Sequence, residues 1–137
     1  MENGWKINTS RELEKLVNEK PLTQEGINHV LQNKINEVVL SNLFDYAYII
    51  PTGYGDFNIF LPAKFSLEER SQGLIHEICH AHYAARGFDL FGRGSLLKQE
   101  DGKKMDELIE KEAQRFYGEN KEFINSIANN YAFVNSV

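Results

Sequence analysis

The sequence contains a single cysteine, Cys79, so one chain cannot form an internal disulfide. It has no run of about 20 apolar residues, the length that a membrane-spanning helix needs, and its charged first 16 residues contain no apolar signal core. Basic residues are also few, because 15 lysines and arginines stand against 20 aspartates and glutamates. The resulting net charge of −5 argues against general binding to nucleic-acid phosphates. These absences predict a cytoplasmic protein without a direct nucleic-acid or membrane partner.

The composition is otherwise ordinary for a soluble globular protein, with 42% hydrophobic and 26% charged residues. A chain of 137 residues is long enough to bury a core without help from disulfides or metals. We therefore expect residues 1–137 to form a single domain.

The first half of the chain predicts two helices and a hairpin. A short helix is expected over residues 8–19, where Thr9 or Ser10 can act as the N-cap. Apolar residues at helical spacing predict a second helix over residues 23–44. Residues 46–62 predict a β-hairpin, because aromatic and β-branched runs flank a turn with the sequence Pro-Thr-Gly-Tyr-Gly-Asp.

A third helix is expected to begin at Ser66, where Glu69 completes a capping box, and to end at Gly87. Residues 87–104 show no clear period and predict a long loop, and residues 105–134 predict two further helical segments. The predicted fold class is α+β. A small antiparallel sheet, formed by the hairpin, would pack against the third helix and a helical C-terminal half.

The third helix contains the pattern H-E-x-x-H, formed by His76, Glu77 and His80. A rotation of about 100° per residue places the two histidines about 40° apart on one face. Both imidazoles can then reach a single Zn²⁺, while Glu77 points toward a bound water that it can deprotonate. Gly73 is expected on the same side, where its missing side chain would leave room for metal or substrate. The motif predicts an active-site helix with a zinc centre.

The remaining polar groups of this helix are not expected to bind the metal. His82 lies about 160° around the helix from His80, which predicts a buried core histidine. Cys79 points to one side of the two ligand positions, so we expect a small packing residue rather than a thiolate ligand.

Two histidines leave a zinc site incomplete, since such a site takes a third protein ligand and keeps a fourth position for water. No histidine follows at the short spacing that metzincins use. The candidates are therefore carboxylates of the next helix, namely Asp106, Glu107, Glu110 and Glu112. Glu110 and Glu112 border opposite sides of one apolar stripe, and periodicity alone does not separate them.

Two motifs carry a resemblance to a known family. The stretch "FSLEERSQGLIHEICHAHY" resembles the start of the active-site helix in the ImmA/IrrE family of metallopeptidases. The stretch "IEKEAQRFYGE" is similar to that family's second motif, E-x-x-A-N-x-F-A. The match puts Glu110 at the ligand position, and Ala113, Gln114 and Phe116 on the alanine, asparagine and phenylalanine. Cys79 stands where the family has glycine, and Tyr117 where it has the closing alanine.

The resemblance implies a zinc metallopeptidase in which His76, His80 and Glu110 hold Zn²⁺ and Glu77 acts as the general base. It also implies that the substrate is a peptide or protein, such as a cytosolic regulator of the repressor type. Gln114 falls one turn after Glu110, where its amide can orient the ligand.

Two other functions are compatible with parts of the pattern. The first is a zinc-binding sensor or interaction module with weak or lost peptidase activity, in which Cys79 or Asp106 would fill the fourth position. Glu77 favours the enzyme, because a structural zinc site has no use for a general base. The second is a DNA-repair metalloprotease of the SprT type, which takes a third histidine from downstream. No histidine follows Gly87 in this sequence, so this function ranks lower.

Two features of the sequence are expected to contact the substrate. Oxyanion stabilisation needs a hydrogen-bond donor, and Tyr54, Tyr83 and Tyr117 are all candidates. The second hairpin strand, residues 56–62, is expected to form a sheet edge on which an extended peptide pairs through its backbone.

Overall fold

The structure, a computed structural model, describes residues 9–43, 45–84 and 99–134. The elements follow in the order α1 (Ser10–Glu19), α2 (Gln24–Asn33), β1 (Ile35–Ser41), β2 (Tyr48–Pro51), β3 (Phe57–Pro62), α3 (Leu67–Ala84), α4 (Gln99–Glu119) and α5 (Lys121–Val134). The predicted α+β class is confirmed, and the C-terminal half is helical. None of the described helices is long and apolar enough to cross a membrane.

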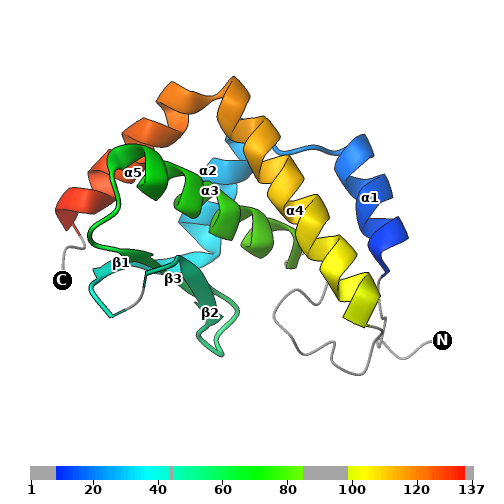
Figure 1. Ribbon diagram of the computed structural model, residues 1–137, viewed down its shortest axis with the longest axis horizontal. Helices are drawn as coiled ribbons and strands as arrows, with labels where there is room; N and C mark the ends of the chain where they lie inside the picture. The colour runs from blue at the N-terminus through cyan, green and yellow to red at the C-terminus, as the bar shows by residue number, and fades with distance from the viewer. Residues whose placement is uncertain (1–8, 44, 85–98, 135–137) are drawn as a thin grey trace.

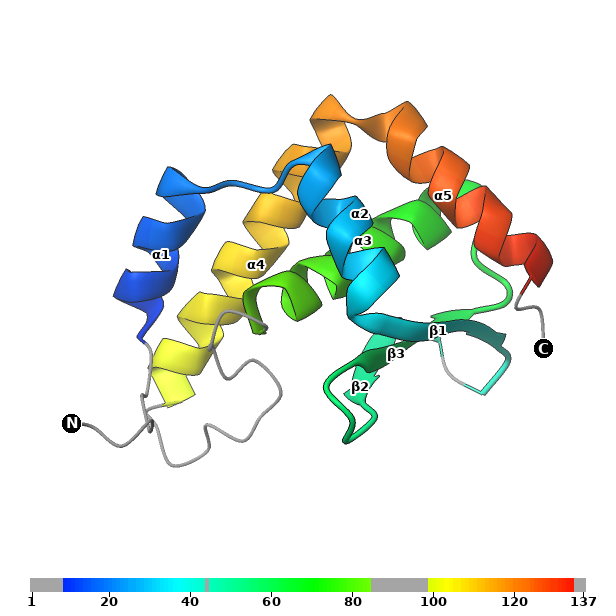
Figure 2. The same ribbon diagram turned by 180° about the vertical axis from the view of Figure 1, so that it is seen from behind.

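Helix α3 is the centre of the arrangement, because it contacts β3, α2, α4 and α5. In Figure 1 the sheet lies below α3, and α4 runs between α3 and α1. The view from behind shows α2 lying against α3 on the other side (Figure 2). Helix α3 is therefore covered on most of its sides, and the histidine pair lies on the side that faces α4.

The predicted helix starts are confirmed where a capping residue sets them. Thr9 caps α1 in a capping box with Glu12, and Thr23 caps α2 by accepting a hydrogen bond from the Gly26 amide. Ser66 and Glu69 form the capping box of α3, with distances of 2.9 and 3.2 Å between backbone nitrogen and side-chain oxygen. Each box satisfies backbone amides that have no partner inside the helix.

The prediction of one helix over residues 23–44 is wrong in its second half. Helix α2 ends at Asn33, and Ile35–Ser41 form strand β1. Val38 and Leu40 alternate into the core, whereas Glu37 is exposed. The β-branched residues of this segment favour a strand. The apolar positions match a helical period only when this segment and the residues of α2 are treated as one continuous stretch.

The hairpin is confirmed, and β1 extends it to a three-stranded mixed sheet. Strands β2 and β3 pair antiparallel, β1 and β3 pair parallel, and the order is β1-β3-β2. The turn holds Gly53 and Gly55 at positive φ values of 93° and 90°. Because β3 is the central strand, the expectation that residues 56–62 form an open edge is wrong. Both hydrogen-bonding sides of β3 are already paired with its neighbours.

Gly73 packs against the sheet, so the expected space for metal or substrate is not there. A Cβ added to Gly73 would lie 3.2 Å from the Cβ of Ala47 and 3.3 Å from Cδ2 of Leu61. Both distances are shorter than ordinary van der Waals contact. The missing side chain allows α3 to approach the sheet closely.

Helix α4 begins earlier than the sequence predicts. The expected loop over residues 87–104 is wrong for residues 99–104, which form the first turns of α4. Residues 87–98, including the expected helix end at Gly87, lie outside the described residues. The two helical segments predicted for residues 105–134 are confirmed as α4 and α5. The sequence suggests a break around Gly118, whereas the two helices separate at Asn120.

Candidate functional site

The two histidines of the motif lie next to each other on α3, on the side that faces α4. Their Nε2 atoms are 3.2 Å apart, and their ring centroids are 4.8 Å apart. The one-turn spacing of His76 and His80 produces this proximity directly. One nitrogen donates and the other accepts in a contact of this kind, depending on the tautomers.

Helix α4 brings Glu110 to the same place. Its Oε1 lies 2.6 Å from Nδ1 of His76, and its other oxygen accepts a hydrogen bond of 2.6 Å from the side-chain amide of Gln114. The structure thus has the contact between Gln114 and Glu110 that the one-turn spacing predicts. His76, His80 and Glu110 form one cluster between two helices.

The donor set fits a zinc ion in part. Zn–N distances of about 2.0–2.1 Å in a tetrahedral site hold two ligand nitrogens about 3.3 Å apart, close to the observed 3.2 Å between His76 and His80. Glu110 contacts Nδ1 of His76, on the other side of the ring from this pair. Accordingly, within residues 9–43, 45–84 and 99–134, no three His, Cys, Asp or Glu side chains are already arranged around one ion. The predicted ligand set stays a prediction.

Burial keeps His80 neutral. Burial and, to a smaller extent, the neighbouring His76 together lower the pKa of His80 to about 4. At pH 7 the ring therefore has a lone pair to offer. Neutral imidazole is the form of histidine that binds metal ions.

Glu77 is almost completely buried, with 6% of its surface exposed. Burial raises its pKa to about 8, and the negative charge of Glu110 contributes in the same direction. A carboxyl group with a pKa near the working pH is suited to both accepting and donating a proton.

The four candidate carboxylates of α4 separate into two groups. Asp106, Glu107 and Glu110 line a hollow of about 740 Å³ together with both histidines. Burial raises the pKa of Asp106, and the charge of His76 opposes this effect. Glu112 faces away from the hollow.

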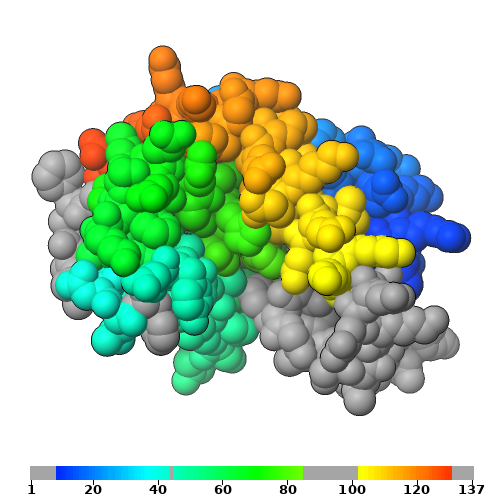
Figure 3. All heavy atoms as spheres, viewed as in Figure 1, coloured from blue at the N-terminus to red at the C-terminus, as the bar shows by residue number. Residues whose placement is uncertain are grey.

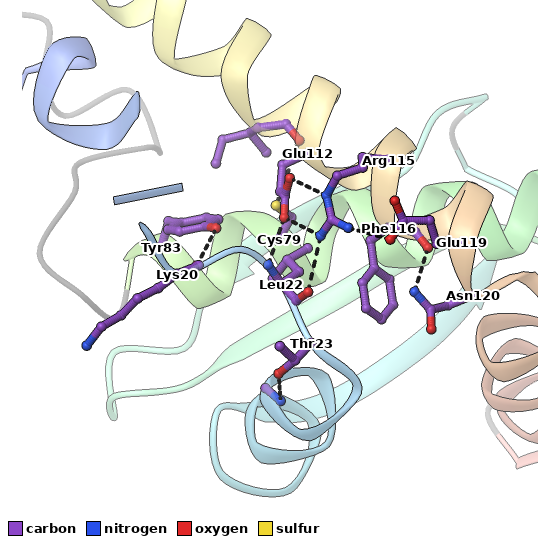
Figure 4. Close-up of polar contacts among 12 residues, drawn as sticks. Lys20, Leu22, Thr23, Cys79, Tyr83, Glu112, Arg115, Phe116, Glu119 and Asn120 are labelled. Atoms are coloured by element: carbon purple, nitrogen blue, oxygen red, sulfur yellow. Dashed lines mark hydrogen bonds and ion pairs between the residues drawn. The ribbon is translucent and has the colours of Figure 1, made fainter. Parts of the chain in front are cut away.

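Glu112 is held in the core instead. It is 4% exposed, and its Oε2 accepts hydrogen bonds from the Leu22 amide at 2.7 Å and from Arg115 at 2.6 Å. Figure 4 shows this network, in which Arg115 also donates to the Leu22 carbonyl. Of the two carboxylates that periodicity leaves open, Glu112 is therefore the one that is buried and paired within the core. The Glu-x-x-Arg spacing is the sequence signal for such a pair, since residues three apart face each other on a helix.

The two residues of α3 that were not expected to bind metal are packing residues. Cys79 is fully buried, and its Sγ lies 3.7 Å from the Ile109 carbonyl oxygen. His82 is 9% exposed and packs edge-to-face on Tyr83, with ring centroids 4.7 Å apart. It also lies beside α2, because a Cβ added to Gly26 would be 3.6 Å from its Cε1.

The candidate oxyanion donors occupy different places. Tyr83 is buried, and its hydroxyl is directed at the Lys20 carbonyl, 3.5 Å away. Tyr54 is 92% exposed in the turn between β2 and β3. Only Tyr117, of the three, lines a cavity with His76, and its hydroxyl lies 3.5 Å from Oδ1 of Asn125. Of the three candidates, Tyr117 is therefore the one that shares a cavity with His76 and Glu110.

Comparison with known proteins adds no relative. No protein-family model, no curated protein and no solved structure matches the chain. The interpretation of the site therefore rests on the geometry of its own residues and on the resemblance of its two motifs.

Proposed function

We propose that this protein is a zinc-dependent peptidase of the HExxH type. The observation that carries the proposal is the pair of imidazole nitrogens 3.2 Å apart on α3. Beside this pair lie a buried glutamate from the same helix, Glu77, and a second carboxylate from α4, Glu110. Packing of a hydrophobic core does not require these polar groups. Burial of the Glu77 carboxyl group costs free energy that packing contacts alone do not offset.

His76, His80 and Glu110 would hold the ion. When bound, zinc supplies a water of lowered pKa and polarises the carbonyl of the scissile peptide. Glu77 takes the proton of the attacking water as the oxygen adds to the carbonyl carbon. It then gives that proton to the amide nitrogen as the C–N bond breaks. Gln114 keeps the Glu110 carboxylate in place through its hydrogen bond.

We infer that the substrate is a peptide or protein, and specifically a cytosolic regulator of the repressor type. The support for this class is the resemblance of the two motifs to the ImmA/IrrE family. A zinc-binding sensor or interaction module is the second candidate. The observation in its favour is the contact between Glu110 and Nδ1 of His76, which can stabilise the helix pair without any chemistry.

Zinc content tests the metal centre. The purified full chain is expected to bind about one Zn²⁺, and the double variant His76→Ala with His80→Ala is expected to bind close to none. His29→Ala is the matched control, because His29 is exposed on α2 and forms hydrogen bonds with Asn33, one turn further along the same helix. Elemental analysis measures the metal, and circular dichroism checks folding. Undiminished zinc in the double variant contradicts the site.

A pair of single variants tests the third ligand. Loss of a residue that only hydrogen-bonds to a metal ligand weakens metal affinity by up to about 100-fold. Glu110→Ala removes a ligand itself, so it is expected to weaken zinc affinity by more than about 100-fold. Glu107→Ala removes an exposed carboxylate from the same hollow and is expected to leave affinity within a few-fold. A competition titration against a chelator measures both. Equal losses in the two variants would show that charge in the hollow matters and that Glu110 is no ligand.

A further inference from the structure

A second, smaller cavity opens beside the candidate metal centre. It has a volume of about 220 Å³ and lies between the first half of α3 and the last turns of α4. His76, Glu110 and Gln114 line both this cavity and the larger hollow. Figure 3 shows the face of the molecule on which α3 and α4 lie side by side. The remaining lining residues are Gln72, Ile75, Ala113, Tyr117 and Gly118.

One wall of this cavity is buried and carries no charge. Ile75 is 1% exposed, Ala113 2% and Tyr117 6%. His76 and Glu110 belong to the candidate metal centre, and the exposed Gln72, Gln114 and Gly118 complete the lining, so the apolar wall is that of Ile75, Ala113 and Tyr117. An apolar side chain placed there loses contact with water and gains contact with carbon atoms.

The larger hollow on the other side of the histidine pair has the opposite character. Its lining residues include two basic and two acidic side chains besides the cluster, namely Lys103, Lys111, Asp106 and Glu107. A charged substrate group finds partners there. In the smaller cavity the wall formed by Ile75, Ala113 and Tyr117 offers a charged group no ionic partner, so contact with that wall is unfavourable for such a group.

We propose that the 220 Å³ cavity binds an uncharged, apolar side chain of the peptide substrate, next to the bond that is cleaved. This inference rests on the proposed peptidase function. The position beside the scissile bond follows from the shared lining residues, because a side chain seated against Ile75 and Ala113 has its backbone close to His76 and Glu110. The cavity would select residues of the size and polarity of leucine, methionine or phenylalanine.

Gly118 offers a way to fill the cavity without disturbing the core. A Cβ added at Gly118 meets no atom within 4 Å, and the same is true of Gly102 in the same helix. Gly118 lines the cavity, so Gly118→Phe adds a ring at its border, whereas Gly102→Phe makes the identical change at a residue of α4 that lines neither this cavity nor the larger hollow. Cleavage of a proteome-derived peptide library by each full-length zinc-loaded protein gives the sequence preference on both sides of the bond.

Wild type and Gly102→Phe are expected to prefer large apolar residues at one position adjacent to the bond. Gly118→Phe is expected to cleave those peptides at least about tenfold more slowly than peptides with glycine or alanine at that position. Gln72→Lys adds a charge at the rim and is expected to shift the preference toward acidic residues. Gln32→Lys, which makes the same change at an exposed position of α2, is the control for Gln72→Lys. A profile without any apolar preference, or one that Gly118→Phe and Gln72→Lys both leave unchanged, overturns the proposal.

A binding measurement separates failure of this proposal from failure of the peptidase function. Titration of the ¹⁵N-labelled full chain with N-acetyl-leucinamide is expected to shift the amide resonances of Ala113 and Gly118, and N-acetyl-aspartamide is expected not to. The shifts should be lost in Gly118→Phe. If wild type cleaves no peptide, the proposed function fails, and the titration alone decides the cavity. Shifts that are absent, or equal for both compounds, then overturn the apolar side-chain site.

Discussion

Glu77→Gln is expected to lower peptide hydrolysis by about 10²–10⁴-fold, the range that general acid–base catalysis supplies. The amide has nearly the shape of the carboxylate, so the buried position of Glu77 on α3 stays filled. It cannot take the proton of the attacking water or pass it to the leaving amine. Because Glu77 is not among the expected ligands, zinc content and thermal stability should stay close to wild type.

The measurement compares kcat/KM for peptides found by a proteome-wide search for new N-termini, or by co-expression with cytosolic repressors. Glu37→Gln is the matched control, since it makes the same change at an exposed position of β1. Elemental analysis of both variants establishes that the metal is retained. If Glu77→Gln and wild type cleave at the same rate, Glu77 has no catalytic role, and the zinc-bearing interaction module becomes the better interpretation.

The histidine pair was predictable because its geometry is local. One helical turn separates His76 from His80, and any helix over these residues brings their rings together. The capping residues Thr9 and Ser66 were predictable for the same reason, since each cap is decided within four residues. These features need no knowledge of how the elements pack.

The choice among carboxylates depended on packing. The apolar stripe of α4 fixes which face is buried, and Glu110 and Glu112 border it on opposite sides. The rotation of α4 between α1 and α3 decides that Glu110 meets His76 and Glu112 meets Leu22. No periodicity in the sequence contains this information. The resemblance selected Glu110, and the structure places that residue against Nδ1 of His76.

Strand β1 was missed because a strand is defined by its partners. Val38 pairs with Ile59 and Leu40 with Leu61, and these partners lie 21 residues further along the chain. The resulting parallel pairing makes β3 central and removes the edge that the hairpin alone would have exposed. Side-chain spacing within residues 35–41 is compatible with either structure, so the tertiary context determined the outcome.

Glu112→Ala is expected to lower the free energy of unfolding by about 2 kcal/mol, because it leaves the buried Leu22 amide without its acceptor and removes the buried partner of Arg115. The Glu112 carboxylate accepts from Arg115 through both oxygens, at 2.8 and 2.6 Å, and from the Leu22 amide at 2.7 Å. Removing it leaves that amide and a guanidinium without their main acceptor. The network ties α4 to the segment between α1 and α2, as Figure 4 shows.

Glu119→Ala is the matched control, because Glu119 binds the same arginine at 2.7 Å but is 64% exposed. An exposed pair of this kind contributes about 0.5 kcal/mol or less. Urea unfolding of the three proteins, followed by circular dichroism, measures the difference. Equal stability of Glu112→Ala and Glu119→Ala would show that burial adds nothing to this ion pair. A large loss in Glu112→Ala alone would show that Glu112, two residues from Glu110, has a structural role rather than a metal-binding one. Its contacts hold α4 in the orientation that places Glu110 next to His76.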